Sequence, residues 1–155
     1  MPNYCANRLT LTGSFAKRQA LVDQVKSEDA IFSFTTIVPE APESDWYHWR
    51  IQHWGCKWDA GDAELEFHDE ERTVYFFQTA WGPPNASFMT QMAAKFAGIG
   101  IDLRFAEAGM EFYGYWTPDK AETWSFQNDD VQEVEEEYHL RPGLELYADL
   151  YQRSG

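Results

Sequence analysis

Apolar and polar residues alternate along several short stretches of the chain, with the period of two that is typical of a half-buried β-strand. Residues 4–12 alternate around Leu9 and Leu11 and end at Gly13, which predicts a strand followed by a turn. Five further stretches alternate in the same way or are rich in β-branched and aromatic residues, so we expect a strand in each. They are residues 31–38, 63–67, 74–79, 101–105 and 111–116.

Three other stretches place apolar residues at the spacing of an α-helix. Ser14 has the position of an N-cap, and the apolar residues that follow it up to Ser27 recur at helical spacing. A pair of prolines precedes the second stretch, over residues 88–96. The third stretch is short and includes Trp46 and Trp49. We expect a helix in each of them.

The order strand, helix, strand, strand, helix, strand is that of a split βαβ unit. We therefore expect an α+β fold of the ferredoxin-like type, a sandwich in which two helices cover one face of an antiparallel sheet. The predicted domain spans residues 1–127 and carries a tryptophan-rich insertion at residues 40–61. Residues 128–155 are expected to form an acidic helical C-terminal extension that packs on this domain.

The charge of the chain is confined to two segments. The 155 residues include 26 acidic and 12 basic side chains, which gives a formal net charge of −14. Residues 40–71 have ten acidic and two basic side chains, a net charge of −8, and residues 128–155 have eight and two, a net charge of −6. A protein that binds nucleic acid through its phosphates needs a surplus of Lys and Arg, so direct nucleic-acid binding is not expected.

Clustered carboxylates favour a protein partner with a basic surface, because opposite electrostatic fields attract and speed association. They can also occupy a groove in which the partner would hold phosphates, so that the protein mimics a nucleic acid. The alternative is a solvated acidic surface that only keeps the protein soluble. The acidic candidates for partner binding are Glu64, Glu66, Asp69, Glu70, Glu71, Asp129, Asp130, Glu133, Glu136 and Glu137.

Tryptophans supply the second set of candidates for partner binding. Trp46 and Trp49 are candidates for an exposed aromatic platform, the kind of surface that carries much of the binding energy in protein interfaces. Burial in the core is the alternative for both residues. For Trp54, Trp58 and Trp81 a place in the core or scaffold is the favoured interpretation.

Little in the chain points to catalysis or to a metal. His48, His53, Cys56 and His68 lack the spacing of a zinc site, so no metal is expected. The carboxylates form no organised catalytic set and no glycine-rich phosphate loop is present, so we expect neither an enzyme nor a bound cofactor. Cys5 and Cys56 are expected to be reduced and buried. Signal-like and membrane-spanning stretches are lacking, which predicts a cytoplasmic protein.

Four motifs follow one another between residues 2 and 116. They are Pro2-Asn3-Tyr4-Cys5-Ala6-Asn7-Arg8-Leu9, Trp54-Gly55-Cys56-Lys57-Trp58, Thr79-Ala80-Trp81-Gly82-Pro83-Pro84, and Glu107-Ala108-Gly109 ahead of Phe112 and Gly114. The set resembles the YubB-like proteins of plasmids and phages, with Tyr4 where that family has Trp. The resemblance implies a ferredoxin-like domain and an origin in a mobile genetic element, and it assigns no active site.

The charge and the resemblance together lead to a functional prediction: a cytoplasmic accessory protein of a mobile element. We expect it to bind and inhibit a host complex that targets nucleic acids, as an anti-CRISPR or anti-restriction protein does, by occupying a basic nucleic-acid site. The expected partner is a basic host protein or ribonucleoprotein. We expect the protein itself to bind neither nucleic acid nor a membrane directly, and to be a monomer or a homodimer. Two alternatives stay open: a small-ligand binder whose tryptophans cage a nucleotide-like molecule, and an enzyme of unknown reaction.

Overall fold

The structure, a computed structural model, describes residues 3–41 and 45–125. Within these ranges the chain forms one antiparallel sheet with the strand order β2-β3-β1-β4-β5-β6. The strands are β1 (Tyr4–Thr12), β2 (Gly61–His68), β3 (Thr73–Ala80), β4 (Gly100–Glu107), β5 (Phe112–Trp116) and β6 (Ala121–Ser125). The α-helices are α1 (Phe15–Gln24), α2 (Trp46–His53) and α3 (Ala86–Lys95).

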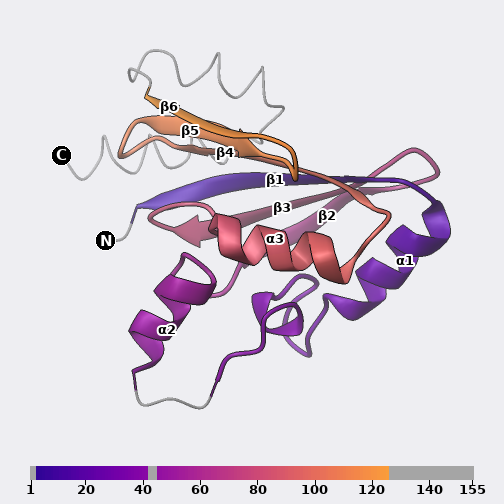
Figure 1. The fold of residues 1–155 in the computed structure, drawn as a ribbon, viewed down its shortest axis with the longest axis horizontal. Coiled ribbons are helices and arrows are strands. Elements are labelled where there is room, and N and C mark those ends of the chain that lie inside the picture. The colour runs from indigo at the N-terminus through magenta and orange to yellow at the C-terminus, as the bar shows by residue number, and fades with distance from the viewer. Residues whose placement is uncertain (1–2, 42–44, 126–155) are drawn as a thin grey trace.

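The strands β2, β3, β1 and β4 with the helices α1 and α3 have the predicted split βαβ arrangement. β1 and β2 run in the same direction with β3 between them, because each pairs antiparallel with β3. All three helices lie on one side of the sheet (Figure 1). The expectation of an α+β sandwich with an antiparallel sheet is therefore confirmed, and the short helix expected around Trp46 and Trp49 is α2, on the same side of the sheet as the other two. Within the described ranges no helix is long and apolar enough to cross a bilayer.

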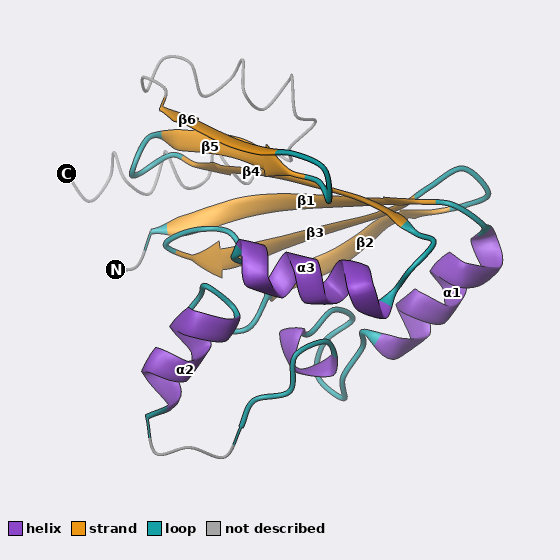
Figure 2. Cartoon of the chain, viewed as in Figure 1, coloured by secondary structure: helices purple, strands orange, loops and turns teal. Residues whose placement is uncertain are grey.

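The main core lies between the sheet and its helices. Leu9 and Leu11 of β1 are buried there together with Leu21 of α1 and Phe88 of α3. Since successive residues of a strand point to opposite sides of the sheet, the residues between those of the core face away from the helices. This side of the sheet, called the second face below, is covered by none of the described helices (Figure 2).

The two longer helices each begin at a side-chain cap. The Oγ atom of Ser14 accepts a hydrogen bond from a backbone N–H of the first turn of α1 at 3.2 Å, as its position predicts. Asn85 caps α3 through Oδ1 and donates from Nδ2 to the carbonyl of Gln52 in α2 at 3.0 Å. Gly55 has φ +84°, and a Cβ atom there would come within 2.6 Å of the Asn85 Cβ. Glycine therefore lets the end of α2 approach the start of α3.

Residues 31–38 do not form a strand, so that prediction is wrong. The segment is irregular, with a short 3-10 helix at Phe34–Thr36, and it buries Phe32 and Phe34 in the core. The Phe34 ring lies 4.6 Å from the Phe88 ring and 5.9 Å from the Phe77 ring, measured between centroids. A run of buried apolar residues fits a strand and an irregular core segment equally well, and periodicity does not separate the two.

The last described strand, β6, is not predicted by the sequence pattern. Its residues are mostly exposed, and it is held by pairing with β5 and by the ring of Trp124, whose centroid lies 5.4 Å from that of Tyr113. The chain then continues into residues 126–155, which are outside the described ranges. The acidic extension expected at residues 128–155 therefore stays a prediction.

Candidate functional site

The acidic candidates in the first charged segment lie on the hairpin of β2 and β3. β2 is an edge strand, and Glu64 and Glu66 are among its exposed residues. Glu64 is opposite Phe76 of β3 in register, and Glu66 contacts Arg8 of β1, so both glutamates lie on the second face. Asp69, Glu70 and Glu71 occupy the turn that follows, and all three are exposed. The structure thus brings these five residues together, as the sequence predicts.

The turn owes its shape to Asp69. Its Oδ1 atom accepts hydrogen bonds from the backbone N–H groups of Glu71, at 2.9 Å, and Arg72, at 3.0 Å. Because both bonds favour the ionised carboxylate, the Arg72 and Glu71 amides hold the pKa of Asp69 below its ordinary value. Asp69 therefore carries its charge as part of the turn, and the side chains of Glu70 and Glu71 project beyond it.

A fully buried arginine of α1 holds the backbone of the turn through hydrogen bonds. Arg18 of α1 donates from Nη1 to the carbonyl of Asp69 at 2.7 Å, from Nη2 to the carbonyl of Glu70 at 2.8 Å, and from Nη1 to the Thr73 hydroxyl at 2.9 Å. Its Nε also donates to the Gly13 carbonyl at 3.0 Å. The backbone of the acidic turn is thereby held against α1. Arg18 is not among the predicted site residues, although its place one helical turn before Leu21 marks it as core-facing.

Glu66 has a cationic partner, Arg8 of β1. The Arg8 Nη1 atom lies 3.3 Å from Glu66 Oε2, and the Arg8 and Glu66 side chains are 9% and 28% exposed. An ion pair this poorly solvated compensates the charge of Glu66 within the molecule. The carboxylates that dominate the field at this end of the sheet are those of the turn.

The two tryptophan candidates have different environments. Trp49 is 8% exposed and belongs to the core, so the prediction that it forms part of a surface platform is wrong. A helix turns its side chains to several sides, and Trp49 is on the side of α2 that packs against Trp54. Trp46 is 44% exposed, as are its neighbours Tyr47, at 45%, and Ile51, at 40%. Trp54 is 1% exposed, in agreement with its favoured place in the core or scaffold, whereas Trp58 and Trp81 are 41% and 50% exposed and lie outside the core.

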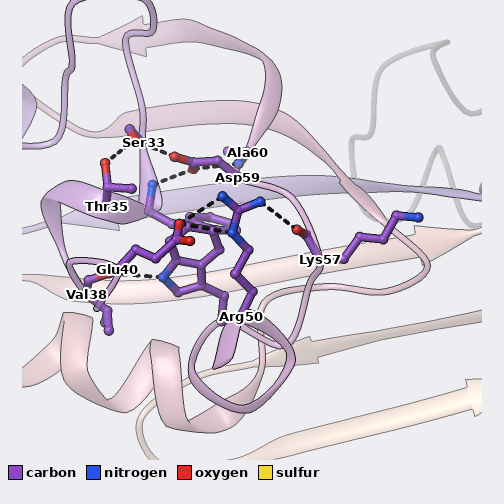
Figure 3. Close-up of polar contacts among 10 residues, drawn as sticks. Ser33, Thr35, Val38, Glu40, Arg50, Lys57, Asp59 and Ala60 are labelled. Atoms are coloured by element: carbon purple, nitrogen blue, oxygen red, sulfur yellow. Dashed lines mark hydrogen bonds and ion pairs between the residues drawn. The ribbon is translucent and has the colours of Figure 1, made fainter. Parts of the chain in front are cut away.

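Polar contacts hold α2 and the segment after it in place (Figure 3). The guanidinium of Arg50 pairs with Glu40 at 2.9 Å and donates to the Lys57 carbonyl at 3.0 Å. Its Cζ atom also lies 4.8 Å from the Trp46 ring centroid and 5.3 Å from that of Trp54. Asp59 accepts from Ser33 and from the backbone N–H of Phe34. The Arg50 guanidinium, itself held by Glu40 and the Lys57 carbonyl, thus contacts the exposed Trp46 ring.

The tryptophan surface and the acidic turn do not form one site. α2 and the turn between β2 and β3 lie at opposite ends of the long axis of the molecule (Figure 1). Trp46 and the carboxylates of the turn, predicted as one partner-binding set, are therefore separated by the fold. The candidates of the second charged segment, Asp129, Asp130, Glu133, Glu136 and Glu137, lie outside the described residues.

A pocket of about 660 Å³ opens on the second face of the sheet. Its lining includes Arg8 of β1, Arg104 of β4 and Arg72 beside the hairpin turn, together with Asp102 and Asp119. Arg8 and Arg104 are directly opposite each other in the pairing of β1 with β4. The cluster is not predictable from the sequence pattern, because only the strand pairing brings its arginines to one place.

Titratable side chains away from the hairpin turn include Glu107, Cys5 and Cys56. Among residues 3–41 and 45–125, no group of three His, Cys, Asp or Glu side chains is placed to hold a metal ion. The carboxylate of Glu107, whose pKa is raised by burial, accepts from the backbone N–H groups of Gly109 and Met110 and so supports a turn. Burial also raises the pKa of both thiols, that of Cys5 well above its ordinary value and that of Cys56 to about 12.

Comparison with known proteins agrees with this fold. The family model described as the ferredoxin-like domain in Api92-like protein matches residues 53–144. The crystal structure of a protein api92 from Yersinia pseudotuberculosis is similar, with a TM-score of 0.61 and 10% sequence identity over 82% of this chain and 99% of that one. At this identity the likeness shows the fold alone. No curated protein matches the chain.

Proposed function

The chain belongs to the family of Api92-like proteins with a ferredoxin-like domain, and from this premise we propose that it binds a basic partner protein through the turn between β2 and β3. The partner-binding residues of this proposal are Glu70 and Glu71, supported by Asp69 and by Glu64 of β2. The second charged segment is considered separately below.

The observation that carries the proposal is the display of exposed carboxylates on a backbone that is already fixed. Arg18 holds the carbonyls of Asp69 and Glu70, and Asp69 closes the turn, so binding has little backbone entropy left to remove. A surface that serves only solubility needs no such fixation, because mobile side chains are hydrated equally well. Fixed charges of one sign favour fast, orientation-specific association with a complementary surface.

The narrower proposal concerns the class of partner. A basic surface large enough to meet this turn is typical of proteins that hold nucleic acid by its phosphates. We therefore place the partner among host proteins or ribonucleoproteins that target nucleic acids, and the activity as inhibition of the anti-CRISPR or anti-restriction type. The resemblance to YubB-like proteins of plasmids and phages supports this step, which rests on analogy of origin.

A tryptophan cage for a nucleotide-like ligand has less support. Trp46, Trp58 and Trp81 are exposed, and no tryptophan is among the residues that line the pocket on the second face. An enzyme of unknown reaction has no side-chain arrangement in its favour among the described residues.

The proposal is tested by release from immobilised DNA. Proteins of a bacterial extract are bound to DNA-cellulose, and the purified protein is applied at low and at high salt. We expect it to release specific proteins at low salt, and the variant Glu70→Lys, Glu71→Lys to release none of them. The matched control is Glu28→Lys, Asp29→Lys, an adjacent exposed pair beyond the other end of α1. Equal release by both double variants contradicts the proposal.

A further inference from the structure

We propose that the arginine-lined pocket on the second face is the docking site of the chain's own acidic C-terminal segment, residues 128–155. This inference does not depend on the function proposed for the hairpin turn. It concerns the other charged segment and assigns it a binding site within the molecule.

The first observation is a pair of like charges. Arg8 and Arg104 are opposite each other on neighbouring antiparallel strands, an arrangement that is unfavourable unless anions compensate it. Glu66 lies 3.3 Å from Arg8, and Asp102 lies 3.2 Å from Arg104. Arg72 adds a third guanidinium, whose Cζ atom is 4.2 Å from the Phe67 ring centroid. A guanidinium has five N–H donors and can serve more than one carboxylate, so the pocket is suited to further anions.

The second observation is an apolar cluster beside the pocket. Val74, Phe76 and Ala106 are 0%, 7% and 0% exposed, although the described helices lie on the opposite side of the sheet. The C-terminal segment contains Val131 and Val134 among its carboxylates. It therefore offers both the charge that complements the arginines and the apolar side chains that suit the cluster.

The third observation is reach. β6 ends at Ser125, opposite Phe112 of β5, and β4 lies two strands away, about 10 Å across the sheet. Arg104 of β4 pairs in register with Tyr115 of β5, and Tyr115 pairs with Glu122 of β6. Glu122 precedes Ser125 by three residues, so Arg104 is displaced from Ser125 by about 10 Å along the strand direction. Glu133 follows Ser125 by eight residues, up to about 26 Å of extended chain. The acidic run can therefore turn back over the second face and enter the pocket.

Docking would change the role of the C-terminal candidates. A net charge of −6 is concentrated in residues 128–155, and the arginines of the pocket would neutralise part of it within the molecule. The residues Asp129, Asp130, Glu133, Glu136 and Glu137 would then cover the sheet and would not meet a partner. The hairpin turn would keep its charge for intermolecular contacts.

The test is a nitroxide label on the full chain, carried by Gln132→Cys. The label is selective because Cys5 and Cys56 are buried. We expect the amide NMR signals of Thr10 and Asp102, at the pocket, to lose most of their intensity, and the signal of Ala20 on α1 to keep it. The double variant Arg72→Gln, Arg104→Gln should restore the pocket signals. The control variant Lys17→Gln, Lys26→Gln removes the same amount of charge in α1 and just after it, and should not restore them.

Each other outcome overturns the proposal. Full intensity at Thr10 and Asp102, or equal losses on both sides of the sheet, would show that the segment does not occupy the pocket. Losses that persist in the arginine variant would show that these side chains do not hold it. Titration with inorganic phosphate tests whether the pocket binds an external anion. If phosphate shifts the amide signals of the pocket and the label on residue 132 has no effect on them, the pocket is a site for an external phosphate group.

Discussion

The guanidinium of Arg8 lies 3.3 Å from the carboxylate of Glu66, and this ion pair joins the acidic edge of the sheet to the arginine-lined pocket. It also distinguishes Glu66 from Glu70 and Glu71 of the turn, which are exposed. A carboxylate that pairs with a nearly buried arginine contributes to folding, whereas an exposed carboxylate contributes little unless the fold gives it a partner, as the backbone amides do for Asp69.

Glu66→Gln should therefore lower the free energy of unfolding by about 1 kcal/mol, because Arg8 would lose its charged acceptor. Glu71→Gln, the control, should change it by less than about 0.5 kcal/mol, as is usual for exposed positions. Urea unfolding followed by tryptophan fluorescence measures both. Identical unfolding midpoints for the two variants would show that the ion pair contributes nothing to stability.

Arg18→Met should lower the free energy of unfolding by about 3 kcal/mol, since three backbone carbonyls and the buried Thr73 hydroxyl would lose their charged donor. The backbone of the acidic turn should loosen, seen as faster amide hydrogen exchange at Glu71 and Arg72. Lys17→Met makes the same change at the neighbouring, exposed position of α1 and should be nearly neutral. If both variants unfold alike, the turn is held by something other than Arg18.

The fold was open to prediction where the chain repeats a simple period. The strands around Leu9, Tyr75 and Leu103 and the helices capped by Ser14 and Asn85 follow from alternation, helical spacing and caps. The structure of the segment with Phe32 and Phe34 could not be predicted, because its residues are buried without a regular period. The strand β6 was not predicted because its sequence is short and mostly polar, and it forms a strand only through pairing with β5.

For the candidate site, the sequence predicts which acidic residues cluster but not which side chains surround them. The carboxylates of residues 64–71 can be read as a cluster because they are neighbours in the chain. Arg8, Arg72 and Arg104 are far apart in sequence, and only the strand order places them around one pocket. The compensation of Glu66 by Arg8 likewise depends on β3 lying between β1 and β2.

Asp69 gives a pH dependence of defined sign. Its folded pKa is below the ordinary value, so the unfolded chain binds a proton first as the pH falls. The stability that Asp69 contributes is therefore complete above about pH 4 and is lost as the pH falls through the lowered folded pKa. Asp69→Asn should be less stable than the parent at neutral pH, and the difference should shrink below about pH 4. A difference that stays constant with pH would contradict this role.

The two thiols should be inert in the folded protein. Cys5 and Cys56 are buried and their pKa values are raised, so little thiolate is present at pH 8 and reagents have no access to it. We expect a disulfide reagent such as Ellman's to label neither cysteine in native buffer and both in concentrated guanidinium chloride. Rapid labelling of either thiol without denaturant would show that the N-terminal part of the core opens readily.

The central claim, that Glu70 and Glu71 bind the basic nucleic-acid site of a partner, is tested most directly by competition. A protein released from DNA-cellulose is purified and bound to fluorescent duplex DNA, and the parent and both double variants are titrated against the complex at two salt concentrations. The account predicts that the parent and the Glu28→Lys, Asp29→Lys control displace the DNA, less effectively at high salt, and that Glu70→Lys, Glu71→Lys does not. Displacement by the turn variant with the affinity of the parent would contradict it.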